Sequence, residues 1–465
     1  HRMTLGNILL IVIALIVLAA AISLINMTKL NIRTIVFVAV AVGFTLRFLY
    51  VLVVQTEPSS DFAKMLSASR MLLQGDYSFL DDAYFMRWAY QIPFVFFQTI
   101  FLWIHDSVIT LKIVNVLLMT GSCLFVYRIA SRYVSEKAAA MACIGYVLYP
   151  APIMLSSVLT NQHASLFFLL WGVDLLLSKK RWYMALCSGL CLCIGNLLRT
   201  DGILIVSVLL CLCLFYLIIY LMKKKNPLII LAGKAGICIA SFFIFTNLIT
   251  FLFSSSPLGK NGMENNYPEW KFMLGLNTES YGMYHEKDID ILSIEDDAAR
   301  RQETIARIQE HFKDVSPLKF ISEKTSRMWA ENETESWSMN HIDRDKELIA
   351  GVSVQWFVNK IKTLDKGMYL FVLMLALLAA LCAFIKKERN TLFLFIGALF
   401  IAYYLSYLFI EIQTRYRYLI MPFLFIAAAY AIDIIKTGIF TEKISVCRDK
   451  KLKFIREKTG DKRMK

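Results

Sequence analysis

The chain has few charged residues and few histidines for its length. Only 18% of its 465 residues are Asp, Glu, Lys or Arg, and six are His, whereas 57% are hydrophobic. The mean hydropathy is +0.56. A soluble globular domain carries about 25% charged residues. This composition therefore excludes an ordinary soluble domain and predicts an all-α protein with many membrane-spanning helices.

The sequence also lacks the short motifs of common nucleotide-dependent and metal-dependent enzymes. It has no phosphate loop, no dinucleotide fingerprint, no GxSxG and no HExxH. Its ten cysteines fall within apolar runs, except Cys447, so their spacing favours neither a disulfide framework nor a zinc site. We therefore expect no bound cofactor, and the sequence leaves open whether a divalent metal takes part.

Basic residues occur in short clusters between apolar runs and in the C-terminal tail 437–465. Positive-inside bias places such clusters in the cytoplasm, and this explains the net charge of +14 without a nucleic-acid partner. The clusters predict eleven spans, with the N-terminus outside and the C-terminus inside. The predicted spans are 5–26, 34–54, 108–130, 138–158, 164–177, 182–198, 202–222, 228–253, 367–385, 392–410 and 419–435.

This topology requires that the apolar run 90–104 lies along the membrane interface, because its roughly 15 residues are fewer than the ~20 that a crossing needs. It also places the polar turns on the outer face, whereas the cytoplasmic turns offer almost only Lys and Arg. The outer residues are Asp61, Asp81, Asp82, Arg87, Thr160, Asn161, Gln162, Arg199, Asp201, Glu411, Arg415 and Arg417. We therefore expect the chemistry on the outer face of the cytoplasmic membrane.

The first outer loop, 55–107, contains the most informative stretch. Pro58 breaks the preceding helix, Asp61 begins an amphipathic helix, and Gly75 ends it. The apolar positions with helical spacing are Phe62, Met65, Leu66, Ala68, Met71 and Leu72. Asp61 is either a helix cap or a catalytic base that faces a lipid headgroup.

A second outer region, 254–365, is predicted to be a mostly helical loop domain. Ser293 and Asp296 indicate a helix start of the capping-box type, and a further helix is expected around Met328 and Trp329. The domain either covers the membrane mouth or contacts substrate. Asn332 begins a glycosylation sequon, which is a weak signal.

Two other outer turns could bind phosphate or sugar. Arg415, Tyr416 and Arg417 either hold a lipid phosphate through forked guanidinium contacts or anchor a helix end at the interface. Arg199 has the same alternatives, although Asp201 could neutralise it. The turn Thr160-Asn161-Gln162 either hydrogen-bonds substrate or caps two helices.

Several stretches together resemble a known family. They are TEPSSDFAKML with AYQIPF, RIASRYVSEKAAAMA with YPAPIM, LLRTDG, and RYRYLIMPFLFIAAAYAI, and they cover most of residues 33–436. In this order they resemble the GT-C superfamily of integral-membrane glycosyltransferases. The likeness is strongest to the protein-O-mannosyltransferase and aminoarabinose-transferase branch in its Gram-positive form.

The resemblance implies a GT-C module at 3–436 and a polyprenyl-phosphate-linked sugar as donor. The acceptor would be an envelope glycopolymer, a lipid or a protein. Asp61 matches the family's first-loop aspartate, and Arg415 or Arg417 matches its late external arginine. The span 5–26 is extra, and Thr160-Asn161 stands where many relatives carry an acidic residue, so Asp81 or Asp82 could supply a second carboxylate. Arg87, Asn161, Gln162, Arg199 and Tyr416 complete the predicted substrate-binding set.

A lipid or polysaccharide transporter is the alternative. Such a protein should have ionisable residues at mid-membrane and broken helices. The predicted spans carry few charged residues, namely Arg47, Lys112, Arg128, Asp174, Lys234 and Asp433, and this scarcity argues against a transporter. A non-catalytic assembly partner would make no special use of Asp61.

Overall fold

The computed structural model describes residues 31–178, 181–223, 226–311, 316–331, 337–339, 342–343, 345–349, 351–386 and 390–437. The predicted first span 5–26, the sequon at Asn332 and the tail beyond residue 437 lie outside the described residues.

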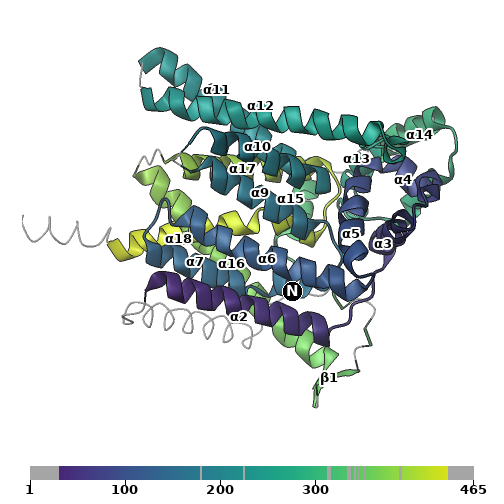
Figure 1. The fold of residues 1–465 in the computed structure, drawn as a ribbon, viewed down its shortest axis with the longest axis horizontal. Helices are drawn as coiled ribbons and strands as arrows, with labels where there is room; N and C mark the ends of the chain where they lie inside the picture. Colours follow the sequence, from purple (N-terminus) through teal and green to yellow (C-terminus); the bar gives the residue numbers. More distant parts are fainter. Residues whose placement is uncertain are drawn as a thin grey trace, which may run out of the picture.

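Apolar helices form the body of the protein (Figure 1). Within the described residues, six are long and apolar enough to cross a membrane. They belong to α2 (Ile32–Val53), α6 (Val108–Ala130), α11 (Gly202–Lys223), α12 (Asn226–Ser254), α16 (Val354–Ile385) and α17 (Thr391–Phe409). Shorter helices pack among them and complete the bundle: α7 (Glu136–Leu148), α8 (Pro150–Leu155), α9 (Gln162–Leu176), α10 (Tyr183–Leu198) and α18 (Met421–Thr437). The described part of the chain is thus that of a predominantly helical, multi-pass membrane protein, and the structure does not confirm a count of eleven spans.

The remaining elements are short. They are α3 (Ser60–Leu73), η1 (Ser78–Asp81), α4 (Ala83–Arg87), η2 (Ala89–Gln91), α5 (Ile92–Ile104), η3 (Pro257–Gly259), α13 (Glu269–Gly275), η4 (Glu286–Ser293), α14 (Asp297–His311), α15 (Pro317–Trp329) and η5 (Thr414–Leu419). Two strands, β1 (Glu347–Ile349) and β2 (Val352–Ser353), form an antiparallel pair in which Glu347 lies opposite Ser353.

One predicted span is interrupted. The run 138–158 was expected to cross as one helix, but α7 ends at Leu148 and α8 begins at Pro150. Proline has no N–H to donate and its ring collides with the carbonyl four residues earlier, so a helix cannot continue through it unchanged. The structure therefore corrects the prediction to two half-helices separated by a break.

The helix predicted at Asp61 is present. It buries Phe62, Met65, Leu66 and Ala68, and Gly75 follows it in the left-handed region with φ of +75°. Ser59, however, occupies the N-cap position, and Asp61 lies within the first turn. A carboxylate in a first turn still interacts favourably with the helix dipole, but Asp61 is not the cap that was considered.

Helix α5 packs along α3. Its 13 residues span about 20 Å at 1.5 Å per residue. The hydrocarbon core of a bilayer is ~30 Å thick, so α5 is too short to cross it. The placement of 90–104 along the interface stays a prediction.

The loop domain between α12 and α16 has its own small core of Tyr267, Trp270, Met273, Leu274 and Ile291. Its helix α14 begins at Asp297, and Asp296 accepts a hydrogen bond from the Ala299 N–H at 3.0 Å. The capping residue is therefore Asp296 and not Ser293.

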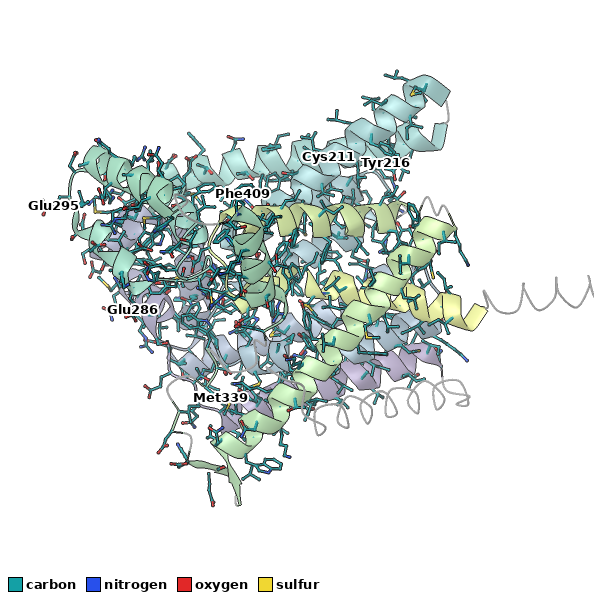
Figure 2. The ribbon with its side chains drawn as sticks, turned by 180° about the vertical axis from the view of Figure 1, so that it is seen from behind. Cys211, Tyr216, Glu286, Glu295, Met339 and Phe409 are labelled. Carbon is teal, nitrogen blue, oxygen red and sulfur yellow. The ribbon has the colours of Figure 1, made fainter. Side chains whose placement is uncertain are left out.

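The end of the predicted outer region is helical as well, because α16 begins at Val354, thirteen residues before the predicted span at 367. The loop domain and the first outer loop gather at one end of the bundle. In Figure 1, α3, α4, α13 and α14 lie at the right, and the last turn of α11 and the first turn of α12 lie at the opposite end. Figure 2 shows the same from behind: Phe409, where α17 ends, lies toward Glu286 and Glu295, whereas Cys211 and Tyr216 of α11 lie toward the other end.

Candidate active-site cavity

A cavity of about 350 Å³ lies where the first outer loop, the loop domain and the polar turns meet. It collects residues that are far apart in the sequence. Five of the predicted site residues line it: Asp61, Asn161, Arg199, Arg415 and Tyr416. Asp201 and Glu411, which were predicted only to share the outer face, line it too.

Asp61 is the carboxylate with the fewest partners in this cavity. Among the described residues, none donates a hydrogen bond to it or lies within ion-pair distance of it. The residue is exposed on its cavity side, but protein surrounds the carboxyl on most other sides. This burial raises the pKa of Asp61 above its usual value, in spite of the positive charges of Lys271 and Arg415. Its carboxylate is therefore the one most able to take up a proton.

Arg415 is held by aromatic rings. Its guanidinium carbon lies 4.6 Å from the ring centre of Trp337, 5.2 Å from that of Phe62 and 5.3 Å from that of Tyr416. The Nε donates to the Gln413 side-chain oxygen at 2.6 Å. Within the described part of the chain, no residue accepts a hydrogen bond from its two Nη groups. These N–H donors are therefore available to bind a phosphate through two parallel hydrogen bonds.

The other cavity charges are paired internally. Lys271 forms an ion pair with Glu411, whose side chain is 3% exposed. Burial alone would raise the pKa of Glu411, but the ion pair with Lys271 and a hydrogen bond from Gln413 (2.8 Å) lower it overall. Glu411 therefore stays ionised and is a poor proton acceptor near neutral pH.

Arg199 and Asp201 form the second internal pair. The Arg199 Nε lies 2.8 Å from the Asp201 carboxylate, and its Nη1 lies 3.4 Å from the side-chain oxygen of Asn161. The guanidinium also lies over the Tyr416 ring, 5.0 Å from its centre. Asp201 neutralises Arg199, as the sequence suggested, and Asp61 and Arg415 remain as the cavity charges without a direct ionic partner among the described residues.

Five predicted binding residues lie outside the cavity lining: Arg417, Gln162, Arg87, Asp81 and Asp82. Arg417 is 4% exposed and donates to the backbone oxygens of Trp329 (3.2 Å) and Glu331 (2.7 Å). Gln162 donates to the Arg415 backbone oxygen at 2.9 Å. These contacts use up the polar groups of Arg417 and Gln162 on the protein itself.

The third is Arg87, which donates to the Leu292 backbone oxygen at 2.6 Å and so joins α4 to the loop domain.

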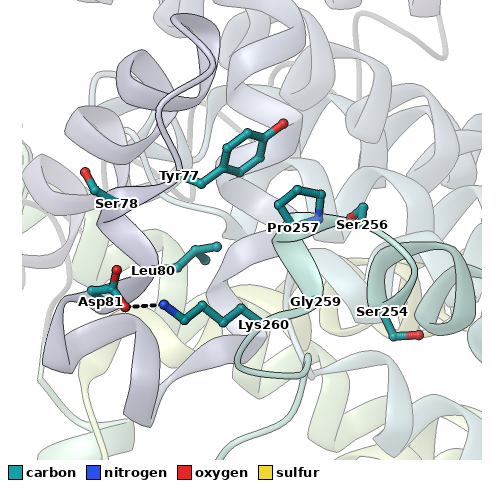
Figure 3. A pocket seen from close by; sticks show the side chains of 9 residues that line it. All are labelled: Tyr77, Ser78, Leu80, Asp81, Ser254, Ser256, Pro257, Gly259 and Lys260. Atoms are coloured by element: carbon teal, nitrogen blue, oxygen red, sulfur yellow. Dashed lines mark hydrogen bonds and ion pairs between the residues drawn. The ribbon is translucent and has the colours of Figure 1, made fainter.

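Asp81 and Asp82 do not supply the second carboxylate of this cavity. Asp81 forms an ion pair with Lys260 across a separate, open surface pocket of about 470 Å³ (Figure 3). Asp82 caps α4 by accepting a hydrogen bond from the Tyr84 N–H at 2.7 Å. The acidic residues that accompany Asp61 are Asp201 and Glu411.

Sequence reasoning missed Lys271, Tyr90 and Tyr407, which also line the cavity. Lys271 lies in the short helix α13 between aromatic residues, and nothing in its local sequence indicates that it meets Glu411, 140 positions away. Tyr90 follows the first amphipathic helix, where an aromatic side chain at an interface is ordinary. In the part of the chain that the structure describes, no cluster of three or more His, Cys, Asp or Glu could hold a metal ion.

A family model described as a predicted membrane protein (DUF2079) matches residues 90–283. No curated protein is significantly similar to the sequence.

Two solved structures from Archaeoglobus fulgidus are similar to this one. The oligosaccharyltransferase in its apo form has a TM-score of 0.45 and 13% identity, and the match covers 90% of this chain and 52% of that one. The archaeal oligosaccharyltransferase AglB in complex with an inhibitory peptide and a dolichol-phosphate has a TM-score of 0.44 and 14% identity, with 93% and 52% covered. The chain thus spans about half the length of these proteins. The DUF2079 match includes the cavity residues Tyr90, Asn161, Arg199 and Lys271, whereas Asp61 and Arg415 lie beyond its ends.

Proposed function

We propose that this protein is a membrane glycosyltransferase of the GT-C kind. It moves a sugar from a polyprenyl-phosphate-linked donor to an acceptor on the outer face of the cytoplasmic membrane. One observation carries the proposal: Asp61 shares a cavity with Arg415, and among the described residues neither the Asp61 carboxylate nor the Nη groups of Arg415 have a hydrogen-bond or ion-pair partner. A base for an acceptor and a fork for a phosphate are the two groups that such a transfer needs.

The chemistry is a single displacement at the anomeric carbon. An acceptor hydroxyl gives its proton to the Asp61 carboxylate as its oxygen forms the new bond to the sugar. The bond from the anomeric carbon to the phosphate oxygen breaks, and the polyprenyl phosphate leaves with that electron pair. Arg415 stabilises the negative charge that gathers on this phosphate, and Lys271 adds positive potential nearby. One displacement inverts the configuration of the anomeric carbon.

The remaining cavity groups suit a sugar. Tyr90, Tyr407 and Tyr416 present aromatic rings, and Asn161 presents an amide that already contacts Arg199 and Gln91. Ligand cavities commonly combine an apolar or aromatic wall with a few fixed polar groups. The cavity volume of about 350 Å³ lies at the lower end of the ~300–1,000 Å³ range of small-molecule sites, which favours one sugar residue over a long oligosaccharide.

The direct test is transfer by the purified protein from polyprenyl-phosphate sugars, followed as release of polyprenyl phosphate with glycopolymer, lipid and peptide acceptors. We expect acceptor-dependent release with at least one donor. No release with any donor, by protein that is folded and that fails to bind polyprenyl phosphate, would contradict the proposal.

The outer-face location has its own test. In a background whose ten native cysteines are replaced by alanine, Asn261→Cys should react with an impermeant thiol reagent in intact cells. Lys386→Cys, at the C-terminal end of α16 and away from the loop domain, should react only after the cells are opened. The reverse pattern would place the cavity in the cytoplasm and contradict this part of the proposal.

A transporter remains the second candidate, because the structure contains the broken helix that the sequence did not predict. Arg47, which is 0% exposed, donates to the Val147 carbonyl at 3.1 Å, and Asp365 accepts from the Ala151 N–H at 3.3 Å. These are the backbone groups that the α7–α8 break releases, so the two charges also have a structural use. Movement of a polyprenyl-linked lipid across vesicle membranes without sugar release would favour the transporter.

A further inference from the structure

Lys324, in α15 of the loop domain, is a buried cation whose hydrogen-bond acceptors among the described residues are all backbone oxygens, and its Nζ also lies 5.6 Å from the ring centre of Phe320. Its side chain is 1% exposed. Its Nζ donates to the carbonyls of Gly275, Leu408 (3.1 Å) and Ile410 (2.9 Å). Among the described residues, no carboxylate lies within ion-pair distance of it.

These three carbonyls belong to two helix ends. Gly275 is the last residue of α13, and Leu408 and Ile410 lie at the C-terminal end of α17. The last carbonyls of a helix have no partner within the helix, and the dipole makes that end negative. One ammonium group therefore caps two helices at once, one from the loop domain and one from the membrane bundle.

The backbone is shaped to admit this ammonium group. Gly282 has φ of +85°, and a Cβ at this position would lie 2.6 Å from the Lys324 Cε and 2.7 Å from its Nζ. Gly275 packs directly on the Ile410 backbone, where a Cβ would collide with main-chain atoms. The Glu411 and Ile412 N–H groups then donate to the carbonyls of Lys271 (2.9 Å) and Gly282 (2.7 Å).

The contacts of Lys324 with Gly275, Leu408 and Ile410, which we call the joint, lie next to the cavity. Lys271 lies one turn before Gly275 in α13, and Glu411 directly follows Ile410, so the two residues of the buried ion pair sit on the two segments that Lys324 joins. We infer that Lys324, as an ammonium group, is a positioning residue that holds the Lys271–Glu411 pair, and with it the donor-phosphate side of the cavity, in place. The kinetic part of this inference rests on the proposed glycosyltransferase function, whereas its structural part does not.

The protonation state matters because an ammonium group has three N–H donors and an amine has two. Burial, opposed only in part by Glu411, lowers the pKa of Lys324 to about 7. The other ionisable groups on these segments have partners of their own: Lys271 pairs with Glu411, Arg327 lies over the Tyr281 ring, and Tyr404 hydrogen-bonds to Thr325. As the pH rises through 7, one of the three carbonyls loses its donor and the joint loosens.

The structural test is hydrogen exchange in the full-length protein. Lys324→Met keeps the length of the side chain but removes all three donors. Lys324→Arg keeps the charge, and Lys319→Met is the control, because Lys319 is an exposed lysine in the same helix. We expect protection of the Glu411 and Ile412 amides to fall ~10-fold or more in Lys324→Met alone. Unchanged protection in Lys324→Met would overturn the inference.

The kinetic test uses the same preparations with a polyprenyl-phosphate sugar. Lys324→Met should raise the KM for the donor ~10-fold with a smaller change in kcat, and Lys324→Arg should restore the KM. Lost amide protection with an unchanged KM would make Lys324 a structural cap only and overturn its positioning role. If no variant or wild-type protein transfers sugar, the proposed function fails, and the exchange result still decides whether Lys324 makes the joint.

A third measurement is the pH dependence of the KM for the donor, and its main part uses the wild-type protein. The KM of the wild-type protein for the donor should rise as the pH increases from 6 to 8.5, because the donor is a phosphodiester whose charge is constant in this range. A KM that is constant across this window would overturn the inference. In Lys324→Arg the rise should disappear.

Discussion

Arg415 and Arg417 are two residues apart, and both were predicted to bind the donor phosphate, yet they belong to two different regions. Arg415 faces the cavity, held by the rings of Trp337 and Phe62. Arg417 turns toward α15 and α16, where it lies 4.5 Å from the ring centre of Tyr369 and donates to two backbone carbonyls. Two residues within one turn of the 3-10 helix η5 thus have different uses: Arg415 faces the cavity, and Arg417 supports the fold.

The two regions differ in what their charged groups leave unused. Around the α7–α8 break, Arg47 and Asp365 bond to the backbone groups that the prolines release. Arg417 likewise bonds to carbonyls. In the cavity, the charges of Arg199 and Asp201 neutralise each other, and so do those of Lys271 and Glu411. Asp61 and the Nη groups of Arg415 have no hydrogen-bond or ion-pair partner among the described residues. A buried charge that satisfies the main chain supports the fold, whereas a charge that is held in place but left without a partner can act on a substrate.

The largest expected effect is that of Asp61→Asn. Asn keeps the size of the side chain, but it cannot accept the acceptor's proton. The transfer rate should fall by ~100-fold or more, with donor binding retained.

Stability gives the control for this variant. The pKa of Asp61 is raised in the folded state, so its ionisation disfavours folding above that pKa. Removing the charge should leave the melting temperature at neutral pH unchanged or higher. Near-normal transfer by Asp61→Asn would show that Asp61 is not the catalytic base. For the same reason, wild-type transfer should rise with pH as Asp61 loses its proton.

The second effect separates the two arginines. Arg415→Gln should weaken donor binding ~10–100-fold, because a charge-assisted hydrogen bond contributes about 1.5–3 kcal/mol, and should change the melting temperature little. Arg417→Gln should do the opposite, since it leaves two partly buried carbonyls without their donors, at about 1–3 kcal/mol. Titration with polyprenyl phosphate and thermal unfolding of both variants test this. Equal losses of affinity would contradict the division into site and scaffold.

The third effect concerns the paired charges of the cavity. Lys271→Met leaves Glu411 buried without its cation and should destabilise the protein by about 1–3 kcal/mol, less than a fully buried pair because Lys271 is one-third exposed. Adding Glu411→Gln should recover most of that loss. Thermal unfolding of the single and double variants measures the coupling. If the double variant is as unstable as Lys271→Met, the loss of stability in Lys271→Met does not come from an unpaired Glu411 carboxylate.

The smallest effect is expected at Asp81. Its ion pair with Lys260 is largely exposed, and such pairs contribute about 0–1 kcal/mol. Asp81→Asn should therefore leave transfer within about twofold of the wild type and stability nearly unchanged. A loss of transfer comparable to that of Asp61→Asn would make the pocket in Figure 3 part of the active site.

The sequence predicted the helical, membrane-spanning character and the amphipathic helix at Asp61, because long apolar runs and helical periodicity are local properties. It also predicted that Asn161, Arg199 and Arg415 share a face with Asp61. Positive-inside bias places turns on one side without any knowledge of packing.

The remaining features depend on packing. The direction in which Arg415 and Arg417 point is set by η5 lying against α9 and α15, which periodicity does not reveal. The break at Pro150 was missed because the run 138–158 is apolar throughout its length. Lys271 and Lys324 act on partners more than eighty positions away, Glu411 and Leu408 respectively.

The most direct test of the central claim is a structure of the protein with a polyprenyl-phosphate sugar bound. We predict that the phosphate lies in the cavity, within hydrogen-bond distance of the Arg415 guanidinium, and that the anomeric carbon faces Asp61. A phosphate bound at Arg417, or in the pocket between Asp81 and Lys260, would contradict it.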